Sequence, residues 1–225
     1  MTVLTSTRAL CGLALVAARA SAFHPALARR CALARPSRVV RRMSDEAAGE
    51  PAPVGEYTEL SRLEIRVGKV VEVSAHPDSE KLLVEKIDVG EAEPRTIASG
   101  IAQFVTPEQL QAENVVVLCN LKPRPVAGVM SAGMLMCASN DDAVVPLRPP
   151  AGAAVGEAVT FDGVEFRPDD PGNRASKALK KIGKFFKTDA DGVATHEGKA
   201  FTTTAGPVRG AMMYDGEAMK DVTVG

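Results

Sequence analysis

The chain has 225 residues and a formal net charge of −1 at pH 7, and its charges are unevenly spread. Residues 1–44 contain eight arginines and no acid, residues 59–172 contain 10 basic and 18 acidic residues (net −8), and residues 173–225 contain nine basic and six acidic residues (net +3). Non-specific affinity for polyanions grows with the number of clustered cations, so the acidic middle region excludes indiscriminate nucleic-acid binding over its whole surface. Any such binding must be local.

The first 44 residues have the pattern of a bipartite targeting leader. Residues 9–18 form an uncharged apolar core that is too short for a membrane-spanning helix, and Ala20-Ser21-Ala22 fits a signal peptidase site. An arginine-rich stretch without acids follows Phe23, as in transit peptides. The arrangement resembles leaders that direct proteins to plastids of secondary endosymbiotic origin, with a mitochondrial presequence as the alternative. We expect this leader to be removed and the mature form to have no membrane segment.

Residues 45–58 hold four acids, two prolines and two glycines and are too poor in apolar residues to fold alone, so we expect a flexible linker and a domain boundary near Glu59. Alternation over residues 63–73 predicts a long strand with a bulge at Gly68. A turn at residues 76–78 precedes a second strand over residues 81–90.

A third short strand is predicted over residues 95–100. Thr106, Pro107 and Gln109 then predict a short helix that starts with a capping box, with Val105 and Leu110 as its hydrophobic staple.

Apolar runs at residues 114–121 and 129–139 predict two further strands. The segment between them, residues 122–128, contains two prolines and is predicted to be an exposed loop. A last strand is expected near residues 157–161. Strands 1 to 3, a short helix and two more strands fit a mainly β fold, the five-stranded Greek-key barrel called the OB-fold, which binds ligands on strands 2 and 3 and on its 1-2 and 4-5 loops. These loops are residues 76–80 and 122–128.

Three separate segments resemble, in order and spacing, the tRNA-binding domain of the endothelial monocyte-activating polypeptide II family. They are residues 61–101 (SRLEIRVGKVVEVSAHPDSEKLLVEKIDVGEAEPRTIASGI), residues 116–139 (VVLCNLKPRPVAGVMSAGMLMCAS) and residues 149–163 (PPAGAAVGEAVTFDG). The resemblance implies an OB-fold domain over residues 59–163 that binds tRNA by shape and backbone. It also implies an aminoacyl-tRNA synthetase as a possible partner.

The C-terminal residues extend the resemblance more weakly. Residues 177–188 (KALKKIGKFFKT) read as a basic helix with Phe185 and Phe186 among its buried residues, and residues 192–201 as a hairpin that turns at Glu197-Gly198. In the family such an extension packs on the barrel where other members dimerise. We therefore expect residues 164–225 to be a helix-and-hairpin extension of this kind and the protein to be a monomer.

The strongest candidate contacts for RNA are Lys122 and Arg124, because rigid exposed loops with paired cations are poorly explained by packing. Ser131 and Met134 match the Ser-x-Gly-Met element of the family, which implies contacts to phosphate, ribose or base. Core packing is the competing interpretation for Met134, and Met130 and Met136 are expected to fill the barrel. The further candidates are Lys81, Lys86, Asn120 and Ser99 near the same face and Lys180 and Lys184 on the basic helix; a solvated surface is the alternative for the four lysines.

No sequence motif for catalysis or ATP binding is present, so we expect a binding protein that is not an enzyme and needs no cofactor or metal. His76 and His196 are expected in a turn or on the surface. Cys119 and Cys137 are expected to be buried and unreactive. The alternative function is an OB-fold module for protein interaction or chaperone-like activity.

Overall fold

The computed structural model describes residues 55–210 and 219–225. The leader predicted for residues 1–44 lies outside the described residues, as does most of the predicted linker, and both stay predictions. Within the described ranges, every helix is too short or too polar to span a lipid bilayer.

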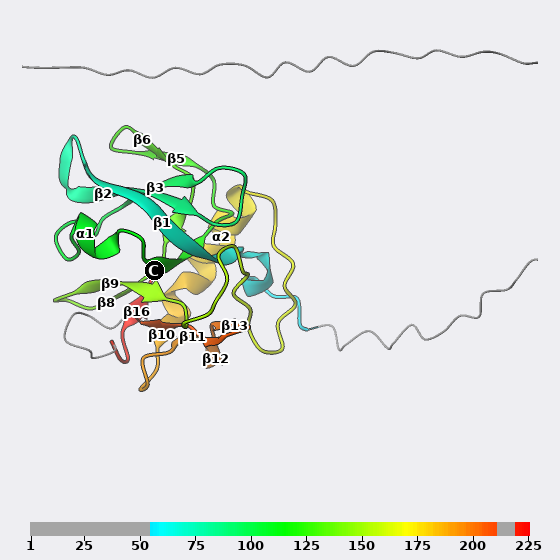
Figure 1. Cartoon of the computed structure of the whole chain (residues 1–225). Helices are drawn as coiled ribbons and strands as arrows, with labels where there is room; N and C mark the ends of the chain where they lie inside the picture. Colours follow the sequence, from blue (N-terminus) through cyan, green and yellow to red (C-terminus); the bar gives the residue numbers. More distant parts are fainter. Residues whose placement is uncertain (1–54, 211–218) are drawn as a thin grey trace, which may run out of the picture. The chain divides into compact units, whose positions relative to one another are not determined.

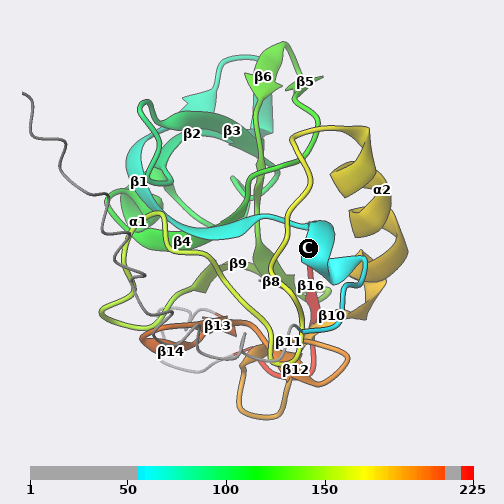
Figure 2. The ribbon, with the colours of Figure 1, turned by 90° about the vertical axis from the view of Figure 1, so that its right-hand side faces the viewer.

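The first half of the described chain forms an antiparallel sheet of five strands in the order β3-β2-β1-β4-β7. Figure 1 shows β1, β2 and β3 of this sheet side by side. These strands are β1 (Ile65–His76), β2 (Ser79–Asp88), β3 (Arg95–Ser99), β4 (Asn114–Leu118) and β7 (Met134–Leu135). The first residues of β1 pair with β4 and the remainder with β2, so one long strand bends through two pairings and the sheet curls into a ring (Figure 2). The N–H of Ala132 donates to the carbonyl oxygen of Thr96 at 2.9 Å, which links the far edge of β3 to the approach to β7. The mainly β prediction is confirmed, while the OB-fold assignment stays a prediction.

The bend in β1 lies three residues beyond its predicted position. The pairing register with β2 shifts between Val70 and Glu72, which makes Val71 the bulged residue rather than Gly68. Gly68 is required for a different reason, because a Cβ atom there would lie 2.6 Å from Cγ2 of Ile87. The prediction recognised a bent strand but placed the bulge wrongly.

The short helix α1 (Pro107–Leu110) forms as predicted. The N–H of Thr106 donates to Oε1 of Gln109 at 2.8 Å, and both Val105 and Leu110 are buried. Val105 and Leu110 belong to the core that fills the ring, so the helix packs against it.

The prediction of a last strand near residues 157–161 was wrong. Residues 157–161 make only isolated bridges, from Ala158 to Arg66 and from Thr160 to Thr202. The strand that pairs with β8 (Cys137–Ser139) is instead β9 (Val144–Arg148), where Pro146 opposes Cys137. Proline within a run of five residues argues against a strand, which is why the sequence alone did not indicate β9.

The C-terminal residues form a helix, a 3₁₀ turn and short strands. These are α2 (Asn173–Ile182), η2 (Gly183–Phe185), β10 (Phe186–Thr188), β11 (Ala194–His196), β12 (Lys199–Ala200), β13 (Thr202–Thr203), β14 (Gly206–Pro207), β15 (Arg209–Gly210) and β16 (Thr223–Val224). Most join β8 and β9 in a second sheet of order β12-β11-β10-β16-β8-β9-β15. The hairpin turns at Glu197 and Gly198, which have φ angles of 50° and 83°, as predicted. The chain also contains η1 (Leu60–Arg62) ahead of β1.

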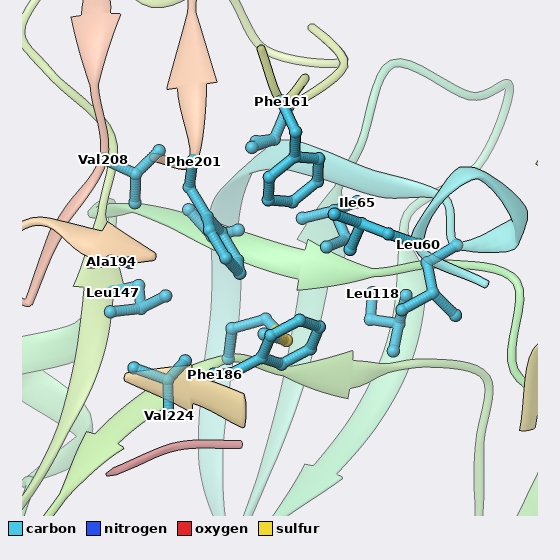
Figure 3. Close-up of a cluster of buried hydrophobic side chains, with 14 of the residues drawn as sticks. Leu60, Ile65, Leu118, Leu147, Phe161, Phe186, Ala194, Phe201, Val208 and Val224 are labelled. Carbon is cyan, nitrogen blue, oxygen red and sulfur yellow. The ribbon is translucent and has the colours of Figure 1, made fainter. Parts of the chain in front are cut away.

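A single core joins this C-terminal part to the first sheet (Figure 3). The ring of Phe201 packs edge to face against Phe186 and Phe161, with centroids 5.3 and 4.7 Å apart. Ile65 and Leu118 of the first sheet belong to the same buried cluster. The C-terminal residues therefore contribute to the stability of the β1–β4 sheet, because removing them would expose the apolar face on which these rings pack.

A second core fills the ring formed by β1 to β4 and includes Cys119 and Cys137, the two cysteines of the described ranges. Cys119 and Cys137 are buried, as predicted. Burial raises the pKa of each thiol to about 12, so both stay protonated at neutral pH and are poor nucleophiles.

The two histidines of the described ranges, His76 and His196, are buried, so a surface position for them was wrong, although each lies next to a turn. His76 is 5% exposed, and its Nδ1 accepts the N–H of Asp78 at 3.0 Å, which fixes the turn between β1 and β2. His196 is 7% exposed and packs against Phe186, and desolvation lowers the pKa of its imidazole. His196 is therefore mainly neutral at pH 7 and fills space in the core.

Glu85 in β2 is a carboxylic acid without any solvent exposure. Its Oε1 accepts a hydrogen bond from the hydroxyl of Ser99, while its Oε2 has no partner in the described part of the chain. Burial raises the pKa of Glu85 from 4.5 to about 7. The folded state therefore favours the protonated acid.

We predict that Glu85→Gln stabilises the protein increasingly as pH rises. The carboxyl has a folded-state pKa above its unfolded value, so the folded state holds a proton that the unfolded state has lost between pH 4.5 and 7, and stability falls over that window by about 3 kcal/mol. The amide keeps the shape of the acid and cannot ionise. Urea unfolding at pH 5 and pH 8 measures the difference between variant and wild type.

The control is Glu80→Gln, at an exposed position of the same strand, which should show no such trend. A Glu85→Gln effect of equal size at both pH values would contradict the assignment of a buried acid.

Candidate nucleic-acid interface

The segment predicted as a loop at residues 122–128 is instead most of a projecting β-hairpin. Its strands are β5 (Arg124–Val126) and β6 (Val129–Ser131), and Arg124 lies opposite Ser131. Ala127 and Gly128 have φ angles of 47° and 93°, as in the two-residue turns that suit hairpins. The prolines did not prevent pairing because a two-stranded hairpin leaves the outer side of β5 without a neighbour. The expected exposure is nevertheless correct, since residues 122–125 are all exposed.

The chain leaves the first sheet after Cys119 and returns to it at Ala132, and this excursion carries the hairpin. The guanidinium of Arg95 connects its two ends. Nη1 of Arg95 donates to the carbonyl oxygen of Cys119, just before the excursion, and to that of Ala132, just after it, the latter at 2.9 Å. The other nitrogens of Arg95 bind both carboxylate oxygens of Glu91, at 2.8 and 2.6 Å. Because Arg95 is in β3, the base of the hairpin is held against the sheet.

Asn120 is a structural residue, and its prediction as an RNA contact was wrong. The side chain has no solvent exposure. Its Oδ1 accepts the N–H of Glu64 at 3.0 Å, and its Nδ2 donates to the carbonyl oxygens of Arg62 and Asp169 at 2.7 and 2.9 Å. The amide thus joins β4 to the start of β1 and to the segment before α2.

The predicted contacts from Ser131 and Ser99 were wrong for the same reason. Ser131 is 5% exposed; its Oγ donates to the carbonyl oxygen of Gly133 at 3.1 Å and accepts the N–H of Ala98 at 3.2 Å. Ser99 is 9% exposed and donates to Glu85. Both hydroxyls hold the base of the hairpin or the adjoining strand, so neither is available to a phosphate.

Lys122 and Arg124 remain as exposed cations on the hairpin, in the part of the chain that the structure describes. Neither forms an ion pair within the described ranges. The backbone is fixed beside them, because the N–H of Lys122 donates to Oγ of Ser176 at 3.3 Å and Leu121 makes a bridge with Gly172. The two charged side chains therefore face solvent from a segment whose backbone is hydrogen-bonded to the rest of the structure.

Ser176 belongs to α2, which lies beside the start of the hairpin. Ala175 and Ala178 are the buried residues of this helix, and Phe186 is buried in β10 just after it. Phe185, predicted to be buried, is 41% exposed, so that prediction was wrong. The lysines of this region are exposed, as predicted: Lys177, Lys180, Lys181, Lys184 and Lys187.

Two of these lysines have partners. Nζ of Lys181 lies 2.5 Å from Oε1 of Glu59, and Nζ of Lys184 lies 4.8 Å from the centroid of the Phe185 ring. Lys180 has no acidic partner within 4 Å in the described ranges. The surface of α2 therefore continues the positive charge of Lys122 and Arg124.

The lysines of β2 are less suited to binding. Nζ of Lys86 lies 2.7 Å from Oε2 of Glu72 across the β1–β2 pair, in a surface ion pair that contributes little to stability and can exchange for a phosphate. Lys81 is exposed near the start of β2. Both stay predictions.

The three methionines near the hairpin have different surroundings. Met136 has no exposure, as predicted, whereas Met130 is 56% exposed and its predicted place in the barrel was wrong, because the hairpin carries it away from the sheet. Met134 pairs with Leu118 and packs partly buried against the core, as the competing interpretation proposed. Its remaining exposed surface lies beside Arg124 along one groove.

Comparison with known proteins identifies the class. Residues 65–158 match the family model described as a putative tRNA binding domain, and this region of the chain belongs to that family. The resemblance that the three sequence segments carry is thereby confirmed.

Two individual proteins with similar sequences also indicate this family. The chain is 49% identical over 152 residues to the cytoplasmic tyrosine–tRNA ligase of Gallus gallus, covering 66% of this chain and 29% of the relative. It is 41% identical over 161 residues to the aminoacyl tRNA synthase complex-interacting multifunctional protein 1 of Mus musculus, covering 72% and 51%. The chain thus spans about half or less of the length of these relatives.

A solved structure extends the likeness beyond the matched domain. The C-terminal domain of Plasmodium vivax p43 superposes with a TM-score of 0.67 at 29% identity, covering 74% of this chain and 98% of that one. Since residues 65–158 are less than half of the chain, the shared structure includes much of the C-terminal part as well.

We predict that Asn120→Ala destabilises the protein by about 3 kcal/mol, because it leaves one backbone N–H and two carbonyl groups without their partner in a buried site. Chemical denaturation measures this loss. Asn173→Ala, at an exposed position at the start of α2, is the control and should change stability by less than about 0.5 kcal/mol. A variant of Asn120 that is as stable as wild type but has lost RNA affinity would restore the original prediction of a direct contact.

Proposed function

We propose that this protein binds tRNA without catalysing a reaction on it, by recognising the shape and backbone of the molecule. The family of residues 65–158 and the names of the relatives support this function. The observation that carries it is the pair of exposed cations, Lys122 and Arg124, on a hairpin whose two ends are fixed by hydrogen bonds of buried and partly buried polar side chains.

Backbone recognition agrees with the composition of the surface. Proteins that bind single strands without sequence preference use aromatic platforms, each worth about 1–3 kcal/mol per base. Residues 59–172 contain only Phe104, Phe161 and Phe166, and Phe161 is buried. Base stacking on aromatic rings therefore cannot be the main contribution, and contacts from cations to phosphates are the alternative that the residues supply.

The basic surface of α2 and of η2 after it is proposed as a second region of phosphate contact, with Lys180 of α2 and Lys184 of η2 as its main residues. Ser176 of the same helix binds the backbone of Lys122, so the two basic regions are adjacent. Adjacent sites on one rigid surface can bind neighbouring phosphates of a single RNA backbone. Their effects on affinity are therefore expected to combine.

The proposed role in the cell is that of an aminoacyl-tRNA synthetase cofactor. A protein that binds both tRNA and a synthetase raises the effective concentration of tRNA near the enzyme. The relatives named as ligases match over a minor part of their length, and the catalytic motifs missing from this sequence agree with a cofactor rather than an enzyme. The monomeric state and the plastid leader, with mitochondrial targeting as its alternative, stay predictions.

We predict that Lys122→Glu combined with Arg124→Glu abolishes a gel shift of tRNA at moderate salt and leaves the fold intact. Both side chains are exposed and unpaired within the described ranges, so reversing them removes phosphate contacts without opening the core. Each lost contact should also reduce the slope of log affinity against log salt by about 0.7–0.9.

Lys199→Glu in β12 is the control for each reversal, because it changes one cation to an anion at the opposite end of the molecule (Figure 2). Lys180→Glu with Lys184→Glu is expected to weaken binding less than the hairpin variant. Unchanged tRNA affinity in the folded hairpin variant would contradict the proposal and favour a protein-interaction or chaperone-like module.

A further inference from the structure

One aromatic side chain is exposed on the basic surface of α2 and η2. Phe185, the last residue of η2, is 41% exposed, although the next residue, Phe186, is fully buried. Nζ of Lys184 lies 4.8 Å from the centroid of the Phe185 ring. Residues 173–188 around this ring contain six cations and no acid. An apolar ring is therefore exposed to solvent within the most strongly cationic stretch of the C-terminal part.

The ring of Phe185 is held in position by its neighbours. It packs edge to face against the imidazole of His196, with centroids 6.3 Å apart and an angle of 89° between the planes. His196 is itself 7% exposed and packs against the buried ring of Phe186. Phe186 also pairs with His196 in the β10–β11 ladder, which fixes the backbone directly after Phe185. A ligand that packs on this ring would have little side-chain freedom to remove.

The other exposed aromatic rings have different surroundings. The ring of Tyr57 already carries the guanidinium groups of Arg62 and Arg167, with centroid distances of 5.3 and 5.7 Å. Phe104 and Phe166 have no lysine or arginine over their rings within the described ranges.

Lys184, in contrast, makes no ion pair in the part of the chain that the structure describes. Its ammonium group can therefore exchange the Phe185 ring for a phosphate. A ring for a base beside a cation for a phosphate is the combination with which proteins bind single-stranded nucleic acid.

We propose that Phe185 stacks on one unpaired base of a bound RNA, with Lys184 at the phosphate beside that base. This inference rests on the proposed function. Phe185 follows Ser176, which holds the backbone of Lys122, by nine residues, and this corresponds to roughly 14 Å along a helix. Figure 2 shows α2 between β5 and β10. The stacked base therefore belongs to a different nucleotide from those that the hairpin contacts.

The base must be unpaired, because bases within a continuous duplex stack on each other and leave no face for a side chain. One platform adds one stacked base to a surface that otherwise supplies phosphate contacts. The inference thus gives the α2 and η2 surface a preference for single-stranded RNA, which lysines alone would not produce.

Binding of an oligouridylate and of a blunt RNA duplex to the full chain tests this preference. Phe185→Leu is expected to weaken binding of the oligouridylate about fivefold, which corresponds to about 1 kcal/mol, the lower end of the range for one stacked base. Its affinity for the duplex should not change. The slope of log affinity against log salt should also stay the same, since no phosphate contact is lost, whereas Lys184→Gln should reduce that slope by about 0.7.

Two variants are the controls. Phe185→Tyr keeps an aromatic ring and should bind the oligouridylate as wild type does. Phe104→Leu makes the same change at another exposed ring, in the segment before α1, and should also leave the affinity unchanged.

Ultraviolet crosslinking of the wild-type chain to the oligouridylate gives a readout that needs no variant. Mass spectrometry is expected to find a nucleotide attached at Phe185. Crosslinks elsewhere and none at Phe185 would overturn the proposal, as would a Phe185→Leu variant that binds the oligouridylate like wild type or loses equal affinity for both RNAs. Failure of the proposed function would show separately, as unchanged tRNA binding in the Lys122 and Arg124 variant.

Discussion

The proposed binding surface depends on one constraint: the excursion between β4 and β7 is fixed at both ends by polar side chains that are buried or, for Arg95, partly buried. Arg95 binds the carbonyl groups of Cys119 and Ala132, Asn120 binds three backbone groups, and Ser131 binds two. Buried polar groups are costly unless all are paired, so these contacts strongly favour a single arrangement of the base of the hairpin. The prolines on either side of Arg124 restrict the backbone further. Cations held in this way lose little conformational entropy when they bind a phosphate.

The acidic surroundings of the cations have a functional consequence. A uniformly basic surface would bind any polyanion, whereas a domain with a net charge of −8 over residues 59–172 repels RNA that does not present its phosphates to the hairpin and to α2. Unfavourable charge elsewhere thereby contributes to selectivity for shape. It also implies that affinity depends only modestly on salt, because the slope of log affinity against log salt grows with the number of phosphate contacts and these contacts are few.

The sequence predicted those features that are set by neighbouring residues. The capping box of α1, the turn at Glu197 and Gly198 and the exposure of Lys122 and Arg124 follow from local patterns, and the structure confirms them. The failures involve contacts between distant parts of the chain. Asn120 looks like a ligand next to two cations, but its partners include Arg62 and Asp169, which no local pattern connects to it. Its position directly after a fully apolar strand was the one available sign of burial.

Hydrogen exchange of the hairpin in the absence of RNA tests the central claim most directly. If buried polar groups hold the hairpin in place, the amides of Arg124, Val126 and Ser131 should exchange slowly in the protein alone and change little when tRNA is added. Fast exchange of these amides in the protein alone, followed by strong protection on binding, would mean that RNA orders the hairpin. That result would contradict a binding surface that is fixed before RNA arrives.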